Sequence, residues 1–344
     1  MKSAAITIIV RALFPTRRQI AVTAALLIAA IALCAPAGAA ETRSTLSIIF
    51  ENDLFYHSDR DYTNGMEASW TPGEDTAVVF PAAIAALLPN FLELNDVRPT
   101  YSLGQMMFTP EHTALAVPPP DERPYAGFLY SALTLTTTTG SGQNQLRVQL
   151  GMIGPASLAA DSQKFIHDLR GFSLPQGWNA QLRDELGLVI SYQKSQTLAS
   201  LAAPSGAGMD FKMHLGGTMG NVFDYLNTGV MGRIGFDLPA DDGPPRMEPS
   251  APGSYSYNPD GVMGAYLFAG AEARLVGRNI FLDGNSFQAS RMVSKKTIVG
   301  DLIVGGAVAF EDFQLSFTHV FRSREYARQK PFDEFGTLNL AVNF

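Results

Sequence analysis

The chain has 344 residues, a formal net charge of −7 and 17% charged residues. A nucleic-acid partner would favour a basic domain, so this composition argues against nucleic-acid binding. After the first 40 residues, no stretch approaches the roughly 20 uninterrupted apolar residues of a membrane helix, which argues against a helical membrane protein.

Residues 1–40 are typical of a cleaved secretory signal peptide. Three arginines precede an apolar run at 20–35, and small residues suited to a signal peptidase follow it at 37–40. Cys34, the only cysteine, is expected to leave with the signal. We therefore expect a signal peptide and one mature domain, residues 41–344, without a disulfide.

The mature part alternates apolar and polar residues with a period of two. In 146–152, leucine, valine and methionine fall on one face, and arginine, glutamine and glycine on the other; phenylalanines repeat the pattern in 313–322. In a membrane the apolar face needs no protein cover and the polar face lines a lumen. A soluble β-sandwich shows the same alternation and stays an alternative at this point.

The pattern at the end of the chain favours a membrane barrel over a soluble β-sandwich. Leu338, Leu340, Val342 and Phe344 alternate with polar or small residues, and the sequence stops at Phe344. A terminal aromatic residue on the lipid face of a last strand resembles the signal read by the outer-membrane insertion machinery. Together with the export signal, it predicts an all-β protein, a transmembrane antiparallel β-barrel in the outer membrane, with the barrel insertion machinery as an assembly partner.

About twelve strands are expected, an even number as in bacterial barrels. They are predicted at 44–53, 64–72, 100–108, 127–138, 144–153, 181–194, 207–219, 225–237, 262–275, 297–310, 312–323 and 335–344. With both termini in the periplasm, the outward connections are 54–63, 109–126, 154–180, 220–224, 276–296 and 324–334. The longer periplasmic connections are 73–99, 139–143, 195–206 and 238–261, and a short amphipathic helix is expected at 78–92.

A first polar cluster flanks the first outward connection. Asn52 and Asp53 follow Glu51 at the end of one strand, and Thr63 lies in 61–65 where the next strand begins. The alternation predicts Asp53 at the top rim of the lumen, with Thr63 opposite. Carboxylate, amide and hydroxyl oxygens suit a hard cation such as Ca²⁺. A capped, solvated hairpin loop accounts for the same residues, so spacing leaves both interpretations open.

A second cluster, 121–127, places two acids and Arg123 beside a proline and a glycine, and by itself predicts only a structured, ion-paired loop.

A third motif predicts a helix of about four turns on an outward loop. Pro155 would open the helix and Gly171 would close it. Leu158, Phe165 and Leu169 share one face, whereas Gln163 and His167 share roughly the opposite one. The helix is therefore expected to lean its apolar side on one surface and present Gln163 and His167 to another.

An imidazole is suited to proton abstraction near neutral pH, which makes His167 a candidate general base; a surface histidine is the alternative. His57 and His112 are expected in outward loops, His214 on the lumen face and His319 on the lipid face. The sequence has no Ser-His-Asp motif of the hydrolase-elbow kind.

In order along the chain, these motifs are similar to those of a known family. They are Glu51-Asn52-Asp53, Asp61 to Gly65, Arg123-Pro124-Tyr125-Ala126-Gly127, Gly154-Pro155, Gln163 with His167, Gly177-Trp178 with Gln181 and Glu185, Gly220-Asn221, and Leu282 to Asn285. The ordered set resembles the outer-membrane lipid A deacylases, the 3′-O-deacylases, over nearly the whole mature chain.

The resemblance implies a twelve-stranded barrel whose site faces the cell exterior at the outer-leaflet rim. It also implies Ca²⁺-dependent hydrolysis of the ester that holds the 3′-linked acyloxyacyl chain of lipid A. By position, Asn52 and Asp53 match the family's first active-site pair, Thr63 its hydroxyl, and Gln163 and His167 its helix pair. His167 would then deprotonate a water, and the metal would stabilise the oxyanion.

One position departs from the family pattern. Members of the family carry a glutamate six residues beyond the histidine, where this chain has Ser173. The loss puts the metal ligands in question, and Asp168 or Asp121 could take the place of the missing acid.

Lipopolysaccharide presents phosphates at the membrane surface, and basic residues on the outward segments are expected to bind them. These are Arg60, Arg123, Lys164, Arg170, Arg291, Lys295 and Lys296, with Tyr125 as a further substrate contact. Ordinary surface charge is the alternative for each of them.

Three other functions compete with a lipid A deacylase. A passive porin explains the barrel but not a loop helix with Gln163 and His167. An outer-membrane phospholipase-type esterase would need a serine near a histidine. A non-catalytic barrel of the same fold fits the departure at Ser173.

Overall fold

The computed structural model of the chain describes residues 43–53, 61–73, 97–250, 253–257, 263–330 and 332–344. The expected signal peptide and the helix expected at 78–92 lie outside these residues.

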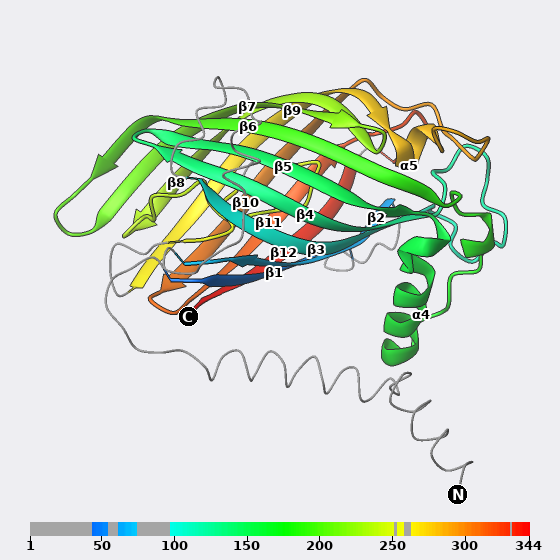
Figure 1. Ribbon diagram of the computed structural model, residues 1–344, viewed down its shortest axis with the longest axis horizontal. Helices are drawn as coiled ribbons and strands as arrows, with labels where there is room; N and C mark the ends of the chain where they lie inside the picture. Colours follow the sequence, from blue (N-terminus) through cyan, green and yellow to red (C-terminus); the bar gives the residue numbers. More distant parts are fainter. Residues whose placement is uncertain (1–42, 54–60, 74–96, 251–252, 258–262, 331) are drawn as a thin grey trace, which may run out of the picture.

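Twelve antiparallel strands form one closed barrel (Figure 1), because each strand pairs with its sequence neighbours and β1 pairs with β12. The strands are β1 (Thr45–Asn52), β2 (Asp61–Thr71), β3 (Arg98–Thr109), β4 (Ala126–Thr139), β5 (Gly142–Ile153), β6 (Glu185–Ala202), β7 (Ala207–Gly220), β8 (Phe223–Phe236), β9 (Met263–Asn279), β10 (Ile298–Phe310), β11 (Phe313–Ser323) and β12 (Phe332–Asn343). The predicted all-β barrel of twelve strands is confirmed, and each predicted strand overlaps an observed one.

The barrel closes where the first and last strands meet. The register runs from Thr45 opposite Asn343 to Asn52 opposite Gly336. Beyond it, Ser44 and Phe344 exchange backbone hydrogen bonds of 3.1 and 2.9 Å. The terminal strand therefore has no open edge, which a barrel in lipid requires because unpaired backbone groups are costly there.

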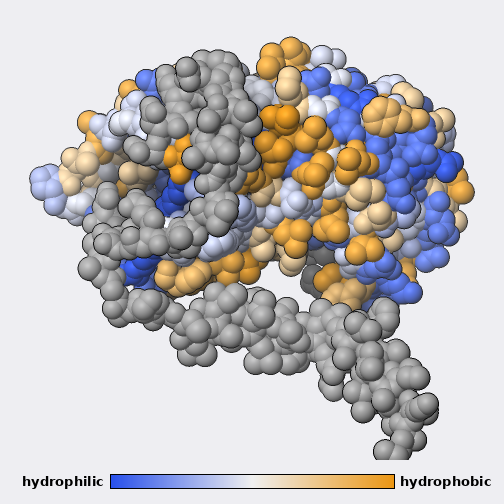
Figure 2. Space-filling view, viewed as in Figure 1, coloured by the Kyte–Doolittle hydropathy of each residue, from blue (hydrophilic) through white to orange (hydrophobic). Residues whose placement is uncertain are grey.

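The period-two pattern determines which residues of the wall face outward and which face the lumen. On β11, Phe313, Leu315 and Phe317 point outward and are 38–40% exposed, whereas Gln314 and Ser316 are buried in the lumen. Figure 2 shows apolar side chains gathered across the middle of the wall and hydrophilic ones toward the end where the outward loops lie. This is the surface that a bilayer covers.

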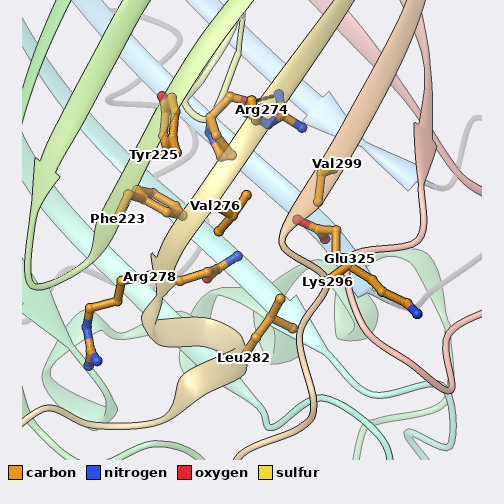
Figure 3. A pocket seen from close by; sticks show the side chains of 11 residues that line it. Phe223, Tyr225, Arg274, Val276, Arg278, Leu282, Lys296, Val299 and Glu325 are labelled. Carbon is orange, nitrogen blue, oxygen red and sulfur yellow. Dashed lines mark hydrogen bonds between the residues drawn. The ribbon is translucent and has the colours of Figure 1, made fainter.

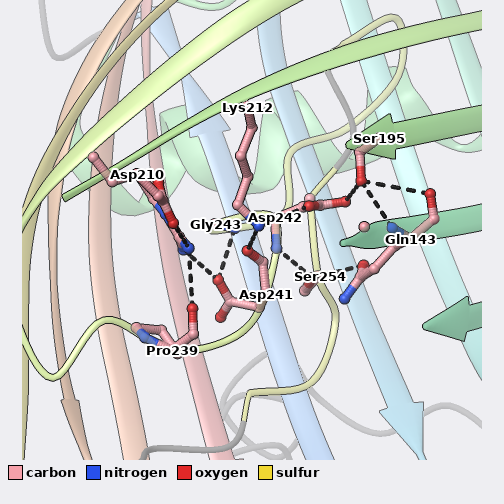
Figure 4. A network of polar contacts seen from close by, with 12 residues as sticks. Gln143, Ser195, Asp210, Lys212, Pro239, Asp241, Asp242, Gly243 and Ser254 are labelled. Carbon is pink, nitrogen blue, oxygen red and sulfur yellow. Dashed lines mark hydrogen bonds and ion pairs between the residues drawn. The ribbon is translucent and has the colours of Figure 1, made fainter. Parts of the chain in front are cut away.

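The connection between β8 and β9 fills the lumen. Within its described part, Asp241 pairs with Arg233 at 2.6 Å, and Lys212 approaches Asp242 at 3.2 Å (Figure 4). Deeper in the barrel, the backbone N–H of Met247 donates to Glu51 Oε1 at 3.1 Å. Buried charges are stable when they are paired and hydrogen-bonded, so this segment is held as an internal plug.

Toward the outward end, a small cavity remains beside the plug. Tyr225, Arg274, Val276, Lys296 and Glu325 are among the residues that line it (Figure 3). Its volume is about 10 Å³, which is room for about one water.

One periplasmic connection differs from the prediction. The segment 195–206 was expected to be a loop, but β6 continues to Ala202, and Ala203–Gly206 alone join it to β7. A register shift between Thr197 and Ala199 marks a β-bulge. The bulge breaks the period-two alternation, and so the pattern appeared to end there.

The outward loops carry short helices: η3 (Pro155–Ser157), α4 (Ala159–Arg170), η4 (Trp178–Ala180) and α5 (Ile280–Asp283). Within the described ranges, no helix combines the length and apolar character needed to cross a bilayer.

Candidate active site

The predicted loop helix exists, but its first turn differs from the prediction. Pro155 opens the 3₁₀ turn η3, and Leu158, with φ 59°, separates that turn from α4. The helix ends at Gly171, whose φ of 70° is a left-handed conformation that glycine adopts without strain. The break at Leu158 makes α4 twelve residues long, shorter than expected.

The two faces of α4 differ in burial. Gln163 and His167 are buried, at 3% and 5% exposure, whereas Leu158 and Leu169 are exposed at 52% and 72%. The face with Gln163 and His167 therefore packs on the protein, and the apolar side faces away from it. In a membrane the apolar side can face lipid, so packing selects the polar side of the helix.

A backbone carbonyl orients the imidazole of His167. Nδ1 lies 2.7 Å from the carbonyl oxygen of Ser173, and the ring meets Phe172 edge-on at 5.7 Å. A carbonyl oxygen only accepts, so Nδ1 is the donor and Nε2 of the neutral ring is the basic nitrogen. Ser173 thus contacts His167 through its backbone carbonyl.

The indole of Trp178 orients Gln163. Its Nε1–H donates to Gln163 Oε1 at 2.7 Å, and both side chains are buried. Tyr125 packs against the same indole with ring centroids 4.9 Å apart. Trp178 lies in one of the family motifs, but nothing in its spacing from Gln163 in the sequence indicates this contact.

The helix begins directly on the outer side of the wall. Met107, Tyr125, Ala159 and Trp178 form one apolar cluster. A Cβ on Gly127 would collide with Ser157 Oγ and Ala159 Cβ. A glycine is therefore required at this position of β4 for the close approach of the base of α4.

The strand register gives the distance between the base of α4 and the first polar cluster. Asn52 pairs with Asn64, Asn64 with Met107, and Met107 with Gly127, all on the outward side. With about 4.8 Å between neighbouring strands, Asn52 lies about 10 Å from Met107 along this row. About seven residues of helix, at about 1.5 Å each, cover the same distance. His167 lies eight residues after Ala159, so this part of α4 is long enough to span it.

Thr63 lies at a bulge near the start of β2 and is buried. A register shift between Tyr62 and Asn64 marks a bulge at Thr63, whose hydroxyl lies 2.6 Å from that of Thr109. Thr109 continues the outward series of β3. Asp53 follows β1 directly and is fully buried. The register of β1 and β2 ends with Asn52 opposite Asn64, so Asp53 and Thr63 are the next residues of the two strands.

The polar side chains of this region carry oxygen donors of the kind that bind a hard cation. Asn52, Asp53 and Thr63 offer amide, carboxylate and hydroxyl oxygens, the type that Ca²⁺ prefers. Among the described residues, no group of three or more histidine, cysteine, aspartate or glutamate side chains is placed to hold a metal. The oxygen chemistry of these three side chains is of the type that suits Ca²⁺.

Arg123 and Tyr125 are internal anchors. Arg123 is fully buried, 3.3 Å from Glu325 and 3.9 Å from Asp61, and its guanidinium lies over the Phe108 ring at 4.6 Å. Tyr125 is fully buried and donates its hydroxyl to the Thr113 carbonyl at 3.1 Å. These positions suit loop positioning better than contact with a headgroup.

Tyr326 belongs to the same group of buried contacts around Asp61. Tyr326, outside the strands, donates to Asp61 Oδ1 at 2.9 Å. Burial, followed by the Asp61 charge, raises the pKa of Tyr326 well above its ordinary value, so it remains a neutral donor.

The other basic residues divide into two groups. Lys164 is exposed on α4, whereas Arg291 donates to the carbonyl oxygens of Pro118 and Pro119, and Lys295 pairs with Asp283 at 2.9 Å. The Arg170 side chain and Arg60 lie outside the described part of the chain. Asp121 is half exposed and pairs with Arg328 at 3.3 Å, and Asp168 is exposed on α4.

The remaining described histidines have structural partners. His112 pairs with Glu122 in a loop, His214 with Glu272 in the lumen at 3.1 Å, and His319 stacks on Phe321 on the lipid side. His57 lies outside the described residues.

The chain was compared with known proteins. The sequence model of a family described as outer membrane protein LpxR matches residues 23–344. The solved structure of LpxR from Salmonella typhimurium is similar in fold, with 19% identity and a TM-score of 0.70, over 87% of this chain and 100% of that one. The β domain of the Bordetella autotransporter BrkA has 9% identity and a TM-score of 0.41, over 89% and 100% of the two chains.

No curated protein matches the sequence. The family match covers nearly the whole chain, its barrel fold agrees with the solved LpxR structure, and the ordered motifs predict the same family. The chain therefore belongs to the LpxR family of outer membrane proteins, the lipid A 3′-O-deacylase family.

Proposed function

We propose that this outer-membrane barrel hydrolyses the ester that holds the 3′-linked acyloxyacyl chain of lipid A, at a site facing the cell exterior. The observation that carries the proposal is the buried imidazole of His167, which the Ser173 carbonyl orients on the outer side of the wall. Family membership supports lipid A as the substrate.

The reaction needs a base because water attacks an ester slowly. His167 Nε2 takes a proton from water as the water oxygen bonds to the ester carbonyl carbon. The carbon–oxygen bond to the sugar then breaks, and Nε2 returns the proton to the sugar oxygen. The products are a free acyloxyacyl acid and a 3′-hydroxyl group.

Gln163 and Asn52 position the reactants. Since Gln163 Oε1 accepts the Trp178 N–H, its amide nitrogen acts as the donor toward the site. Asn52 contributes a second amide from the wall. Donors fixed in advance stabilise the developing oxyanion without reorganising during the reaction.

Asp53 and Thr63 would hold Ca²⁺. When bound, the ion supplies positive charge for the developing oxyanion. Lys164 and Arg170 are proposed to bind the anionic headgroup, whereas Arg123 and Tyr125 hold the loops that frame the site.

Observations on the described residues weigh against two competing functions. Ser195 lies opposite His214 in the register, but it donates to Asp242, and His214 pairs with Glu272, so they form no nucleophile–base pair. The plug segment occupies the lumen, which argues against a passive pore.

Mass spectrometry of lipid A from cells with and without the protein tests the proposal. We expect loss of one acyloxyacyl unit when the wild-type barrel is present, with a His167→Asn variant as the matched inactive control. Unchanged lipid A with a folded wild-type barrel in the outer membrane would favour the non-catalytic alternative.

A further inference from the structure

We infer that α4 is an interfacial helix whose apolar face lies among the acyl chains of the outer leaflet. This face consists of Leu158, Ile166, Leu169 and the adjoining Phe172, which are 52%, 41%, 72% and 40% exposed. The inference concerns contact with lipid and does not depend on ester hydrolysis.

The helix has three distinct faces. Gln163 and His167 are buried toward the protein, the apolar face is exposed, and Asp161, Lys164 and Asp168 form an exposed charged face between them. A helix surrounded by water would place its exposed leucines on the protein instead. An apolar side next to a charged side, on a helix of low overall hydrophobicity, is typical of helices at a bilayer surface.

The apolar face continues a surface that is already in lipid. Two residues along β4 from Gly127, away from the outward loop, the register aligns Leu129 with Met152 and Met152 with Leu186. Leu186 is 60% exposed on the outer wall. The base of α4 therefore lies beside the lipid-facing row of the barrel, and outer-leaflet acyl chains are the occupant nearest to it.

The dimensions agree with this placement. Gly127 and Leu129 are two residues apart, which is about 7 Å along a strand. An α-helix with its side chains extends about 5 to 6 Å from its axis. Figure 1 shows α4 projecting from the end of the barrel, across the strand direction. The base of α4 is therefore close to the level of Leu129, where the lipid-facing wall begins, and a helix across the strands runs along the bilayer rather than through it.

Site-directed spin labelling of the full chain tests the inference. Cys34 is the only cysteine, so a Cys34→Ser background accepts single labels. Nitroxides at Leu169→Cys, at the polar-face control Asp168→Cys and at the wall reference Leu186→Cys are compared in the purified barrel reconstituted in phospholipid vesicles. Collision with oxygen, which concentrates in the bilayer, is measured against collision with a water-soluble nickel complex.

We expect the Leu169 label to resemble the Leu186 label, with high oxygen and low nickel access, and the Asp168 label to show the reverse. A Leu169 label as accessible to nickel as the Asp168 label would overturn the inference. So would a Leu169 label shielded from both reagents and broadened by a neighbouring spin, because a second copy would then cover the face. Ester hydrolysis is not the readout, so an inactive but immersed helix would refute the proposed function alone.

Discussion

Replacing His167 by asparagine tests the roles of the two imidazole nitrogens separately. The amide nitrogen of asparagine takes the place of Nδ1 and can still donate to the Ser173 carbonyl, 2.7 Å away in the native ring. The variant therefore keeps the buried hydrogen bond and loses the base at Nε2. A positioned general base contributes about 10²–10⁴ to a rate, which corresponds to about 3 to 5 kcal/mol of activation free energy.

The assay is deacylation of purified lipid A by the detergent-solubilised barrel, with the heat-dependent gel shift as the folding test. Ser173→Ala is the matched control, because it removes the hydroxyl but keeps the carbonyl, and it should retain activity. A folded His167→Asn barrel with near-normal turnover would refute the reasoning.

Three further outcomes are expected. Trp178→Phe leaves the buried Gln163 oxygen without its donor, a loss of about 1–3 kcal/mol; turnover should fall while the barrel still shows its heat-dependent gel shift, and unchanged turnover would remove Gln163 from the mechanism. Chelation should abolish activity and Ca²⁺ should restore it, except in Asp53→Ala; full activity in strong chelator would exclude the metal. Deletion of Phe344, which closes the barrel against Ser44, should lower the yield of heat-modifiable barrel in the outer membrane, and a normal yield would count against the terminal signal.

The fold could be predicted because lipid and lumen impose opposite demands on neighbouring residues. In 144–153, apolar residues that face lipid alternate with polar residues that face the lumen. This alternation is visible within a few residues, so short stretches of sequence were enough to locate the strands. These stretches were misleading where a bulge shifts the alternation, as at Thr197–Ala199 in β6. A bulge depends on the pairing of two strands, which a single strand's sequence does not show.

The candidate site was predictable only in its residue types. Gln163 and His167 stand four residues apart, and so a shared helix face followed from the spacing. Which of the two faces packs on the protein did not follow from the spacing, because either face could lean on the wall. The acceptor for His167 is a backbone carbonyl, which any residue at position 173 would supply, so the identity of Ser173 gave no indication of the contact.

The contact between Gly127 and the base of α4 gives a last prediction. An alanine at this position would place its Cβ against Ser157 Oγ and Ala159 Cβ, and overpacking of this kind costs about 1–3 kcal/mol. The barrel should survive, because its strands are held by continuous hydrogen-bonded ladders, whereas the helix has to move away from the wall. Gly140→Ala is the control, since nothing lies within 4 Å of its Cβ position. We expect Gly127→Ala to increase proteolytic cleavage near α4 and to lower turnover, with an unchanged gel shift. If cleavage and turnover equal those of Gly140→Ala, the docked position of α4 is not what holds His167 in place.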